Sequence, residues 1–339
     1  MIMSNSSMPS TSLQNNSETY HEIYSGSVRH TLPPQIESPY ALGATIYCPA
    51  THADLYALAS GQKFANCRSI VICLEDAVAE QDIEAGLKNL SKLLNIFAQF
   101  GVPENAPYLF IRPRHLDMAQ LLTEWKNINL ISGFVLPKFN LDNLLDWKHI
   151  LLPNLQIMPT LETAEFFDSG YVGEFRQAMQ QEIPSVLALR IGGNDLLNCL
   201  NMRRPRHLTI YETPVVTLIH QLIGQLVPFG FRLTAPVFEY FANLTLLRQE
   251  TERDVLLGLV GKTAIHPSQI DVIHEAFQVS QHDYLDAQQI LQLDAKAVFS
   301  NNGSMLEPAT HKQWAMQVLE RAKYYGVTAP EHSYILKNG

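Results

Sequence analysis

The sequence predicts an α/β protein built on a (β/α)8 TIM barrel, followed by a C-terminal helical extension. Between residues 44 and 280, eight short apolar runs alternate with eight longer stretches that have helical periodicity. The short runs are apolar throughout rather than alternating, which indicates strands that are buried on both faces of a parallel sheet. These units span roughly 240 residues, close to the ~250 residues typical of such barrels.

The predicted strands and helices follow one another in a regular order. Strands are expected at 44–48, 69–74, 108–112, 133–137, 156–160, 186–191, 231–235 and 261–265. Helices are expected after them at 52–64, 80–99, 115–127, 141–150, 162–180, 213–229, 243–257 and 267–279. In the second helix, Leu87, Leu90 and Leu94 recur on one face, as in a helix packed on a sheet. The turn at 48–51 lacks the glycine-rich motif of a nucleotide-binding open sheet, which favours the barrel.

The barrel is expected to occupy residues 41–280, with a segment of different character at each end. Residues 1–40 are predicted to be polar and flexible, because 13 of the first 30 residues are Ser, Thr or Asn. They contain neither the basic nor the apolar stretch of a signal peptide. Residues 281–339 are predicted to form the extension, with helices at 282–298 and 308–325 joined by the polar residues 300–304.

Composition and charge argue against several classes of partner. The net charge of −9, from 24 Lys and Arg against 33 Asp and Glu, disfavours nucleic acid. No apolar run reaches the ~18 residues that a membrane-spanning helix needs. The four cysteines form no CxxC pair, which disfavours a zinc site or a disulfide framework and is typical of a cytoplasmic protein. Charged residues make up only 17%, against ~25% in a typical protein, which indicates that other subunits cover part of the surface.

Most of the predicted strands are followed by ionisable side chains. In a barrel of this kind the catalytic residues lie at the carboxyl ends of the strands. The groups found there are Glu75 and Asp76, Arg112 and Arg114, Lys138, Glu162, the Gly192-Gly193-Asn194-Asp195 segment and His266. They are therefore expected to converge on one rim of the barrel, although they are far apart in the sequence.

Glu162 and Asp195 are the candidate metal ligands on this rim. They follow neighbouring strands, so their carboxylates can meet around one ion. Two carboxylates that leave several coordination positions to water and substrate are the usual arrangement for Mg²⁺. The alternative is that each carboxylate opens a helix and caps it, where the helix dipole favours an anion.

The other rim residues are candidates for substrate binding and catalysis. Arg112 presents a planar donor group suited to a carboxylate or an enolate oxygen, or it serves only as a counter-ion to Glu75. Glu75 and Asp76 could orient metal-bound water, or cap the following helix. The same two alternatives, a contact to substrate and a purely structural counter-ion, apply to Lys138. Gly192 and Gly193 either let the backbone approach a ligand closely or form a plain tight turn.

Two further features carry weaker signals. His266 precedes a Pro-Ser pair at a predicted helix start, which favours a structural role. The loop 203–206 holds three arginines in four residues and would either grip an anionic substrate or lie solvated on the surface.

The chain resembles the citrate lyase β-subunit-like family of carbon–carbon bond lyases, which includes malyl-CoA lyases and related acyl-CoA lyases. The similar segments are YCPATHADLYALASG, VICLEDAV, FIRPR, GFVLPKF, IMPTLETA, GGNDL, GKTAIHPSQI and GSMLEP. They run in family order and cover nearly all of residues 44–325. Within the family, the chain is most similar to a divergent branch of stress-response (tellurite-resistance-type) operons.

The resemblance implies roles for several rim residues. It implies that Glu162 and Asp195 bind Mg²⁺ and that Arg112 holds the keto or carboxylate group of the substrate. It also implies that Glu75 and Asp76 form hydrogen bonds to metal-bound water. By the same comparison Lys138 lines the site.

The sequence departs from the family pattern at two places. Glu307 stands where many members carry an aspartate, an acid that the resemblance places in the site of a neighbouring subunit. The loop at 235–239 lacks the usual acidic pattern, which puts coenzyme A (CoA) binding in question. Pro236 in this loop is expected to contact substrate, together with Gly192 and Gly193.

These observations predict a Mg²⁺-dependent lyase that cleaves or forms a carbon–carbon bond in a small keto or hydroxy carboxylic acid, free or as a CoA thioester. The alternatives are a class II aldolase of 2-keto-4-hydroxy acids that uses no thioester, and a catalytically silent barrel that binds a metabolite. Retention of Glu162, Asp195 and Arg112 together favours an enzyme.

A homo-oligomer, either a trimer or a hexamer, is also expected, with Glu307 acting on a neighbouring subunit's site. An apolar stripe on the last predicted helix (Trp314, Val318, Leu319) must pack against something. The alternative is that the C-terminal helices fold back on their own barrel and that Glu307 caps the helix that begins near Pro308.

Overall fold

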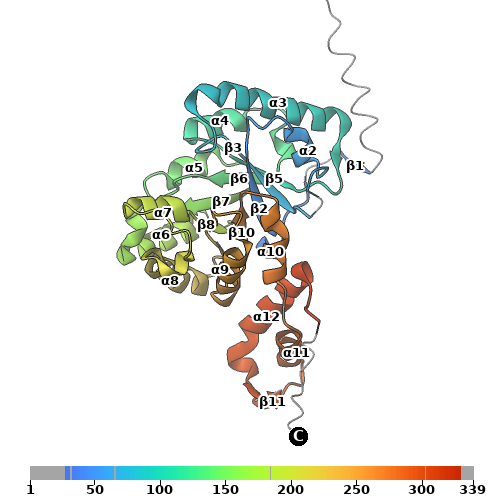
Figure 1. Ribbon diagram of the computed structural model, residues 1–339, viewed down its shortest axis with the longest axis vertical. Coiled ribbons are helices and arrows are strands. Elements are labelled where there is room, and N and C mark those ends of the chain that lie inside the picture. Colours follow the sequence, from blue (N-terminus) through green and yellow to red (C-terminus); the bar gives the residue numbers. More distant parts are fainter. Residues whose placement is uncertain (1–26, 31–32, 65, 184, 302, 330–339) are drawn as a thin grey trace, which may run out of the picture.

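The computed structural model describes residues 27–30, 33–64, 66–183, 185–301 and 303–329. Its centre is a parallel sheet of eight strands in the order β10-β2-β3-β5-β6-β7-β8-β9 (Figure 1). The strands are β2 (Ala44–Pro49), β3 (Ser69–Cys73), β5 (Tyr108–Arg112), β6 (Gly133–Leu136), β7 (Gln156–Leu161), β8 (Leu189–Ile191), β9 (Leu233–Thr234) and β10 (Lys262–Ala264). A parallel bridge between Ala235 and Lys262 joins the two ends of the sheet. The predicted barrel is confirmed.

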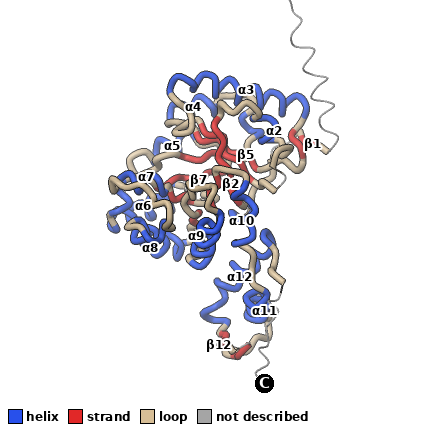
Figure 2. Tube along the Cα trace, viewed as in Figure 1, coloured by secondary structure: helices blue, strands red, loops and turns tan. Residues whose placement is uncertain are grey.

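Helices surround the barrel and connect its strands (Figure 2). They are α2 (Leu55–Ala59), α3 (Ile83–Phe100), α4 (Leu116–Thr123), α5 (Leu144–Ile150), α6 (Ser169–Glu182), α7 (Gly193–Cys199), α8 (Val215–Leu226), α9 (Leu244–Leu256) and α10 (Ser268–Ala276). The predicted barrel helices are all shorter than expected, and the local cause is plain in two of them. Helix α2 ends before Gly61, whose φ of 80° is left-handed and breaks the helix. The stretch at 162–180 begins with a 3-10 turn, Ala164–Phe167, and becomes α-helical only after Asp168.

Alternate residues of the strands face two separate apolar cores. Ile70 and Ile72 of β3 belong to the large core between the strands and the helices, whereas Val71 belongs to a small core inside the barrel. The same alternation occurs on β5, where Phe110 points inward between its outward-facing neighbours. Because both faces are buried, the strands are apolar throughout, which is the pattern from which the parallel sheet was predicted.

The C-terminal extension projects away from the barrel (Figure 1). It consists of α11 (Gln281–Ile290), a hairpin of β11 (Phe299–Asn301) and β12 (Ser304–Leu306), and α12 (Pro308–Tyr325). The prediction for 282–298 was therefore wrong beyond Ile290, and residues 300–304 form part of a hairpin rather than a plain linker. Gly303, with φ of 79°, supplies the left-handed conformation that a tight hairpin turn needs.

The apolar stripe of α12 packs mostly within the extension itself. Val318 and Ala322 lie in a small core shared with α11, and Leu319 is partly buried against it. Trp314, at the start of the stripe, remains 41% exposed. The stripe thus has a partner inside the chain, except at Trp314.

The extension is attached at the amino ends of the barrel strands. Tyr325, in the last turn of α12, stacks on Phe277 at 5.0 Å between ring centroids and meets Tyr40 edge-on at 6.3 Å. Arg68, just before β3, lies 4.8 Å over the Tyr325 ring. Because Tyr40 and Arg68 precede their strands, this contact is at the end of the barrel opposite to the predicted site.

Of the segment 1–40, residues 1–26 and 31–32 lie outside the described residues. In the described remainder, β1 (Val28–Arg29) pairs with β4 (Val102–Pro103). The main chain of Ile36 forms two hydrogen bonds with the Gln156 side chain, at 2.8 and 2.9 Å, and Ile36 belongs to the core inside the barrel. This stretch therefore packs beneath the barrel before β2 begins. None of the helices formed by the described residues is long and apolar enough to cross a membrane.

Candidate active site

Arg112, at the carboxyl end of β5, is the centre of the charged group on the barrel rim. Its Nη2 lies 2.7 Å from Glu75 Oε2, 2.9 Å from Glu162 Oε1 and 3.7 Å from Asp76 Oδ2. Glu75 and Asp76 directly follow β3, and Glu162 follows β7. The structure thus brings together predicted site residues from three strands around one guanidinium group.

Lys138 supports two of these carboxylates in different ways. Its side-chain Nζ lies 3.2 Å from Glu75 Oε1, and its main-chain N–H donates a hydrogen bond of 2.8 Å to Glu162 Oε1. Lys138 has a φ of 47°, a left-handed conformation that is uncommon for a residue with a side chain. Such strained positions cluster at functional sites, where the surrounding structure holds them. We infer that this conformation directs the N–H toward Glu162.

The two glycines after β8 make room for neighbouring side chains. A Cβ atom on Gly192 would lie 2.3 Å from Glu162 Cβ and 2.5 Å from Glu162 Oε2. A Cβ atom on Gly193 would lie 2.7 Å from Pro236 Cβ. The sequence left a close approach to a ligand and a tight turn as alternatives. The structure adds a third reason for the glycines, namely the close packing of Glu162 and Pro236.

Neither of the two candidate metal ligands is an N-cap residue, so the capping part of the alternative is wrong, whereas the helix-dipole part holds for Asp195. The residue at the N-cap of α7 is Gly192, and the residue at the N-cap of the 3-10 turn after β7 is Thr163. Asp195 instead lies in the first turn of α7, where the helix dipole favours its negative charge. Glu162 is buried, with 3% of its surface exposed, and its Oε1 accepts both bonds described above.

The electrostatic environment of Glu162 and Asp195 suits a cation. The pKa of Glu162 is raised to about 7, first by burial and then by the negative charges of Asp195 and Glu75, against the opposing charge of Arg112. Burial and the charge of Asp76 likewise raise the pKa of Asp195. Burial and neighbouring negative charge therefore disfavour two ionised carboxylates at this point, and a divalent cation between them would offset this cost.

The donor set also fits Mg²⁺. Glu162 and Asp195 offer only oxygen atoms, which this ion prefers. Within the ranges that the structure describes, no group of three or more His, Cys, Asp or Glu side chains is arranged to hold an ion unaided. Two carboxylates would leave the remaining positions to water and substrate, as expected for Mg²⁺.

Arg114 and His266 have structural roles at the rim. Arg114 Nη1 donates hydrogen bonds to the carbonyl oxygens of Glu75, at 3.3 Å, and Val78, at 3.0 Å, which fixes the loop after β3. His266 Nδ1 lies 2.8 Å from the hydroxyl of Ser268 at the start of α10.

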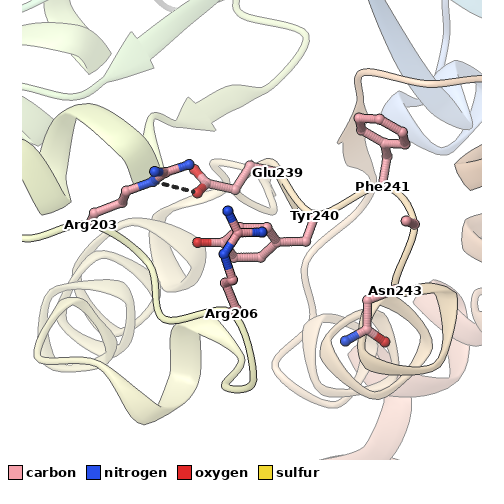
Figure 3. A pocket seen from close by; sticks show the side chains of 7 residues that line it. Arg203, Arg206, Glu239, Tyr240, Phe241 and Asn243 are labelled. Atoms are coloured by element: carbon pink, nitrogen blue, oxygen red, sulfur yellow. Dashed lines mark hydrogen bonds and ion pairs between the residues drawn. The ribbon is translucent and has the colours of Figure 1, made fainter.

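The loop 203–206 divides into a buried and an exposed part. Arg204 is fully buried and pairs with Glu250 of α9, while its Nη2 donates to the carbonyl of Val237 at 2.8 Å. For Arg204, both predicted alternatives, a substrate grip and a solvated position, are therefore wrong. Arg203 and Arg206 are different, because they line an open pocket of about 600 Å³ with Glu239, Tyr240, Phe241, Ala242 and Asn243 (Figure 3). In this pocket Arg203 pairs with Glu239 at 3.3 Å.

Sequence reasoning missed the buried charges that surround Arg204. Lys262 Nζ lies 2.9 Å from Glu250 and 2.8 Å from Asp254, and the side chains of all three have no exposed surface. The sequence offered one indication of these buried charges, namely that Lys262 lies near the start of an apolar predicted strand.

Glu307 lies apart from the rim residues of its own chain. It is the N-cap residue of α12, the position that the capping alternative gave it, but its side chain makes no capping hydrogen bond. It directly follows β12, which lies at the outer tip of the extension (Figure 2). The extension touches the barrel at the opposite end of α12, so the structure does not place Glu307 with Glu162 and Arg112.

Comparison with known proteins decides the family. A sequence profile of the carbon–carbon bond lyases of the TIM-barrel fold matches residues 36–327. The chain belongs to this family. The predictions of a citrate lyase β-subunit-like protein and of a carbon–carbon lyase are thereby confirmed.

Curated relatives carry related names. The chain is 27% identical over 286 residues to a citrate lyase subunit beta-like protein of Deinococcus radiodurans, covering 78% of this chain and 90% of that protein. It is 26% identical over 220 residues to a (3S)-malyl-CoA thioesterase of Cereibacter sphaeroides, covering 62% of this chain and 70% of that protein.

Solved structures share the fold. The protein CitE of Mycobacterium tuberculosis, in complex with magnesium, acetoacetate and coenzyme A, matches with a TM-score of 0.61 and 20% identity. The match covers 84% of this chain and 99% of CitE. A citrate lyase beta subunit from the same organism, complexed with oxaloacetate and magnesium, matches with a TM-score of 0.53 and 20% identity, covering 70% of this chain and 98% of that one.

Proposed function

We propose that this protein is a Mg²⁺-dependent lyase that cleaves or forms a carbon–carbon bond in a small keto or hydroxy carboxylic acid, free or as a thioester. Glu162 and Asp195 hold the ion. The observation that carries the proposal is the contact of Arg112 with Glu162, beside Asp195, at the catalytic end of a lyase-family barrel. The CitE structures of M. tuberculosis that contain magnesium together with acetoacetate or oxaloacetate support the same class of ligand.

When bound, Mg²⁺ supplies Lewis acidity that polarises a carbonyl oxygen of the substrate. Arg112 holds the carboxylate or the developing enolate oxygen. Its Nε is buried and has no hydrogen-bond partner among the described residues, so this donor remains after Nη2 has paired with Glu75 and Glu162. A fixed donor of this kind stabilises charge as it develops, because the donor needs no reorganisation during the reaction.

Glu75, Asp76 and Lys138 position the groups that touch substrate. Glu75 and Asp76 keep Arg112 in place and orient water at the ion, while Lys138 fixes Glu162 through its main-chain N–H. Gly192, Gly193 and Pro236 form the adjoining wall of the site. The presence of all these rim residues together argues for an enzyme rather than for a barrel that binds a metabolite without catalysis.

Calorimetric titration with Mg²⁺ tests the metal assignment. We expect Glu162→Gln and Asp195→Asn to lower Mg²⁺ affinity at least tenfold, because each removes one of two anionic ligands. Asp146→Asn, an exposed aspartate on α5, is the matched control and should bind as the wild type does. Wild-type affinity in both site variants would overturn the assignment.

Arg112→Lys tests the substrate clamp. The substitution keeps the charge but removes the planar donor geometry, so activity should fall by an order of magnitude or more while Mg²⁺ still binds. Activity is read by mass spectrometry of short 2-keto acids incubated with and without acyl-CoA, which also separates thioester chemistry from aldolase chemistry. Full activity in a less stable Arg112→Lys protein would assign Arg112 a structural role.

A further inference from the structure

Arg190 of β8 crosses the inside of the barrel directly beneath the rim. It is 3% exposed, and its Nη2 donates a hydrogen bond of 2.5 Å to Thr263 Oγ1 on β10. Its Nη1 lies 3.6 Å from Met158 Sδ on β7, and its guanidinium lies 5.4 Å from the centroid of the Tyr47 ring on β2. The side chain therefore reaches elements on both sides of the lumen.

This buried charge has no anionic partner in the part of the chain that the structure describes. Its contacts are a hydroxyl, a thioether and an aromatic ring. The other two deeply buried cations, Arg204 and Lys262, behave differently, because each pairs with a carboxylate of α9. An unpaired buried charge is strongly unfavourable, so the position of Arg190 calls for an anion.

Two hydroxyl groups beside Arg190 also lack partners. Thr160 on β7 and Thr234 on β9 are the residues paired with Arg190 in the register of the sheet, one on each side. Both side chains are buried, and neither Oγ1 has a hydrogen-bond partner among the described residues. Buried polar atoms without partners are uncommon, and two of them on the strands that flank Arg190, beside a buried charge without an anionic partner, indicate a bound group.

Thr160, Arg190 and Thr234 form one layer of inward-facing side chains, and this layer adjoins the candidate active site. Glu162, directly after β7, is the next inward-facing position beyond Thr160, and Gly192, directly after β8, is the corresponding position beyond Arg190. The space beside Gly192 is filled by the Glu162 side chain, so this carboxylate of the rim borders the layer that contains Arg190. The Tyr47 ring lies 5.4 Å from the Arg190 guanidinium, and although burial raises the pKa of Tyr47, the charges of both Arg190 and Arg112 lower it.

We propose that Arg190, Thr160 and Thr234 bind a second carboxylate of the substrate, distal to the keto acid end that is held by Arg112, Glu162 and Asp195. The substrate is then a dicarboxylic keto acid, and Arg190 is the residue that selects it over a monoacid. A guanidinium flanked by hydroxyl donors matches a carboxylate in charge and in hydrogen-bond geometry. This inference rests on the proposed function, because it assumes that the keto acid end binds at the rim.

Matched pairs of ligands test this inference without requiring turnover. Binding of 2-oxoglutarate and 2-oxopentanoate, and of 2-oxoadipate and 2-oxohexanoate, is measured by calorimetry at saturating Mg²⁺. In at least one pair the wild type should bind the diacid tenfold or more tighter than the monoacid of equal length. Arg190→Met should reduce this preference to within about twofold by weakening the diacid alone, because a charge-assisted contact is worth about tenfold or more.

Two further variants keep the test informative if Arg190→Met does not fold. Thr160→Val and Thr234→Val preserve shape, remove one hydroxyl each and should lower the diacid preference several-fold. Arg253→Met, an exposed arginine in the last turn of α9, is the control and should keep the full preference.

The outcomes separate this inference from the proposed function. The first case is that both keto acids of a pair bind in the presence of Mg²⁺. If the wild type then shows no preference for the diacid in either pair, or if the Arg190 and threonine variants keep that preference, ordered water and not a carboxylate occupies the space beside Arg190. The inference is then wrong and the proposed function stands. If neither acid binds in the presence of Mg²⁺, both are overturned.

Discussion

At the scale of single residues, Glu162 depends on three neighbours from different strands. Arg112 and the main chain of Lys138 donate to its Oε1, and Gly192 leaves the space that its side chain fills. The position of one carboxylate is thus set by a guanidinium, a strained main-chain conformation and an absent Cβ. This arrangement holds the carboxylate in one orientation before any ion binds, which lowers the cost of binding.

Gly192→Ala should disable the metal site without adding or removing charge. The new methyl group would lie 2.3 Å from Glu162 Cβ, an atom too close to the main chain to move easily. We therefore expect Mg²⁺ affinity, measured by calorimetry, to fall at least tenfold. Gly224→Ala on α8 is the control, because a Cβ there meets no atom within 4 Å. Wild-type metal binding by Gly192→Ala would show that Glu162 is free to shift.

At the scale of secondary-structure elements, buried charges join the loop after α7 to α9 and β10. Arg204 and Lys262 flank Glu250, and Lys262 also contacts Asp254. The positive charges of Lys262 and Arg204 hold the pKa of Glu250 below its usual value, against the effect of burial. The cluster fixes the base of the loop whose exposed arginines line the open pocket.

Arg204→Met should destabilise the protein much more than Arg203→Met. Removing one partner of a buried ion pair leaves charge uncompensated and costs about 3–5 kcal/mol, whereas an exposed pair is worth about 0–1 kcal/mol. The two arginines are adjacent, and only Arg204 is buried. Urea unfolding followed by circular dichroism measures both, and equal free energies of unfolding would contradict the cluster's structural role.

His274 joins α10 to the start of β2 and makes this contact sensitive to pH. Its Nε2 accepts a hydrogen bond of 3.0 Å from the main-chain N–H of Ala44, and burial lowers its pKa to about 4. Below pH ~6.5 the unfolded chain binds a proton that the folded protein does not bind. Stability should therefore fall as the pH decreases from ~6.5 to ~4, by up to ~3 kcal/mol from this residue.

The free energy of unfolding at several pH values tests this expectation. His274→Gln, which cannot titrate, should show a smaller loss of stability than the wild type across that range. His149→Gln, an exposed histidine on α5, should leave the pH dependence as it is. An unchanged slope in His274→Gln would assign the acid sensitivity to other groups.

At the scale of the whole molecule, the extension holds Glu307 away from its own barrel. Met305, Trp314 and Met316 nearby are 62%, 41% and 48% exposed, so this end of the extension carries apolar surface that no part of the described chain covers. We propose that a second copy covers it in a closed homo-oligomer, a trimer or a hexamer, and that Glu307 enters the neighbour's site.

Mixing two inactive variants tests this assembly. If sites are shared, Glu162→Gln and Glu307→Gln protomers are each inactive, but a hybrid contains sites with both residues intact. After subunit exchange of equal amounts, about a quarter of the sites should be active in a cyclic assembly. Activity is followed together with light scattering. A monomer, or no recovered activity after demonstrated exchange, would contradict the proposal.

The sequence by itself determined the barrel and the residues of its rim. The apolar strands at regular intervals predict a parallel sheet, and that sheet places Glu75, Arg112, Lys138 and Glu162 at one end. These are local properties, because burial on both faces of a strand and position at a strand end can be read from consecutive residues. The hairpin at 299–306 was missed, since its tight turn was read as a polar linker.

Only the tertiary structure decided which charges are buried and what surrounds them. Arg203 and Arg204 are neighbours in sequence, yet one faces solvent and the other a carboxylate 46 positions away. Arg190, which lies inside an apolar strand, was not singled out from the sequence, and its lack of an anionic partner depends on residues from four other strands. The energy of a charge depends on its distance to other charges in space, which the order of residues does not specify.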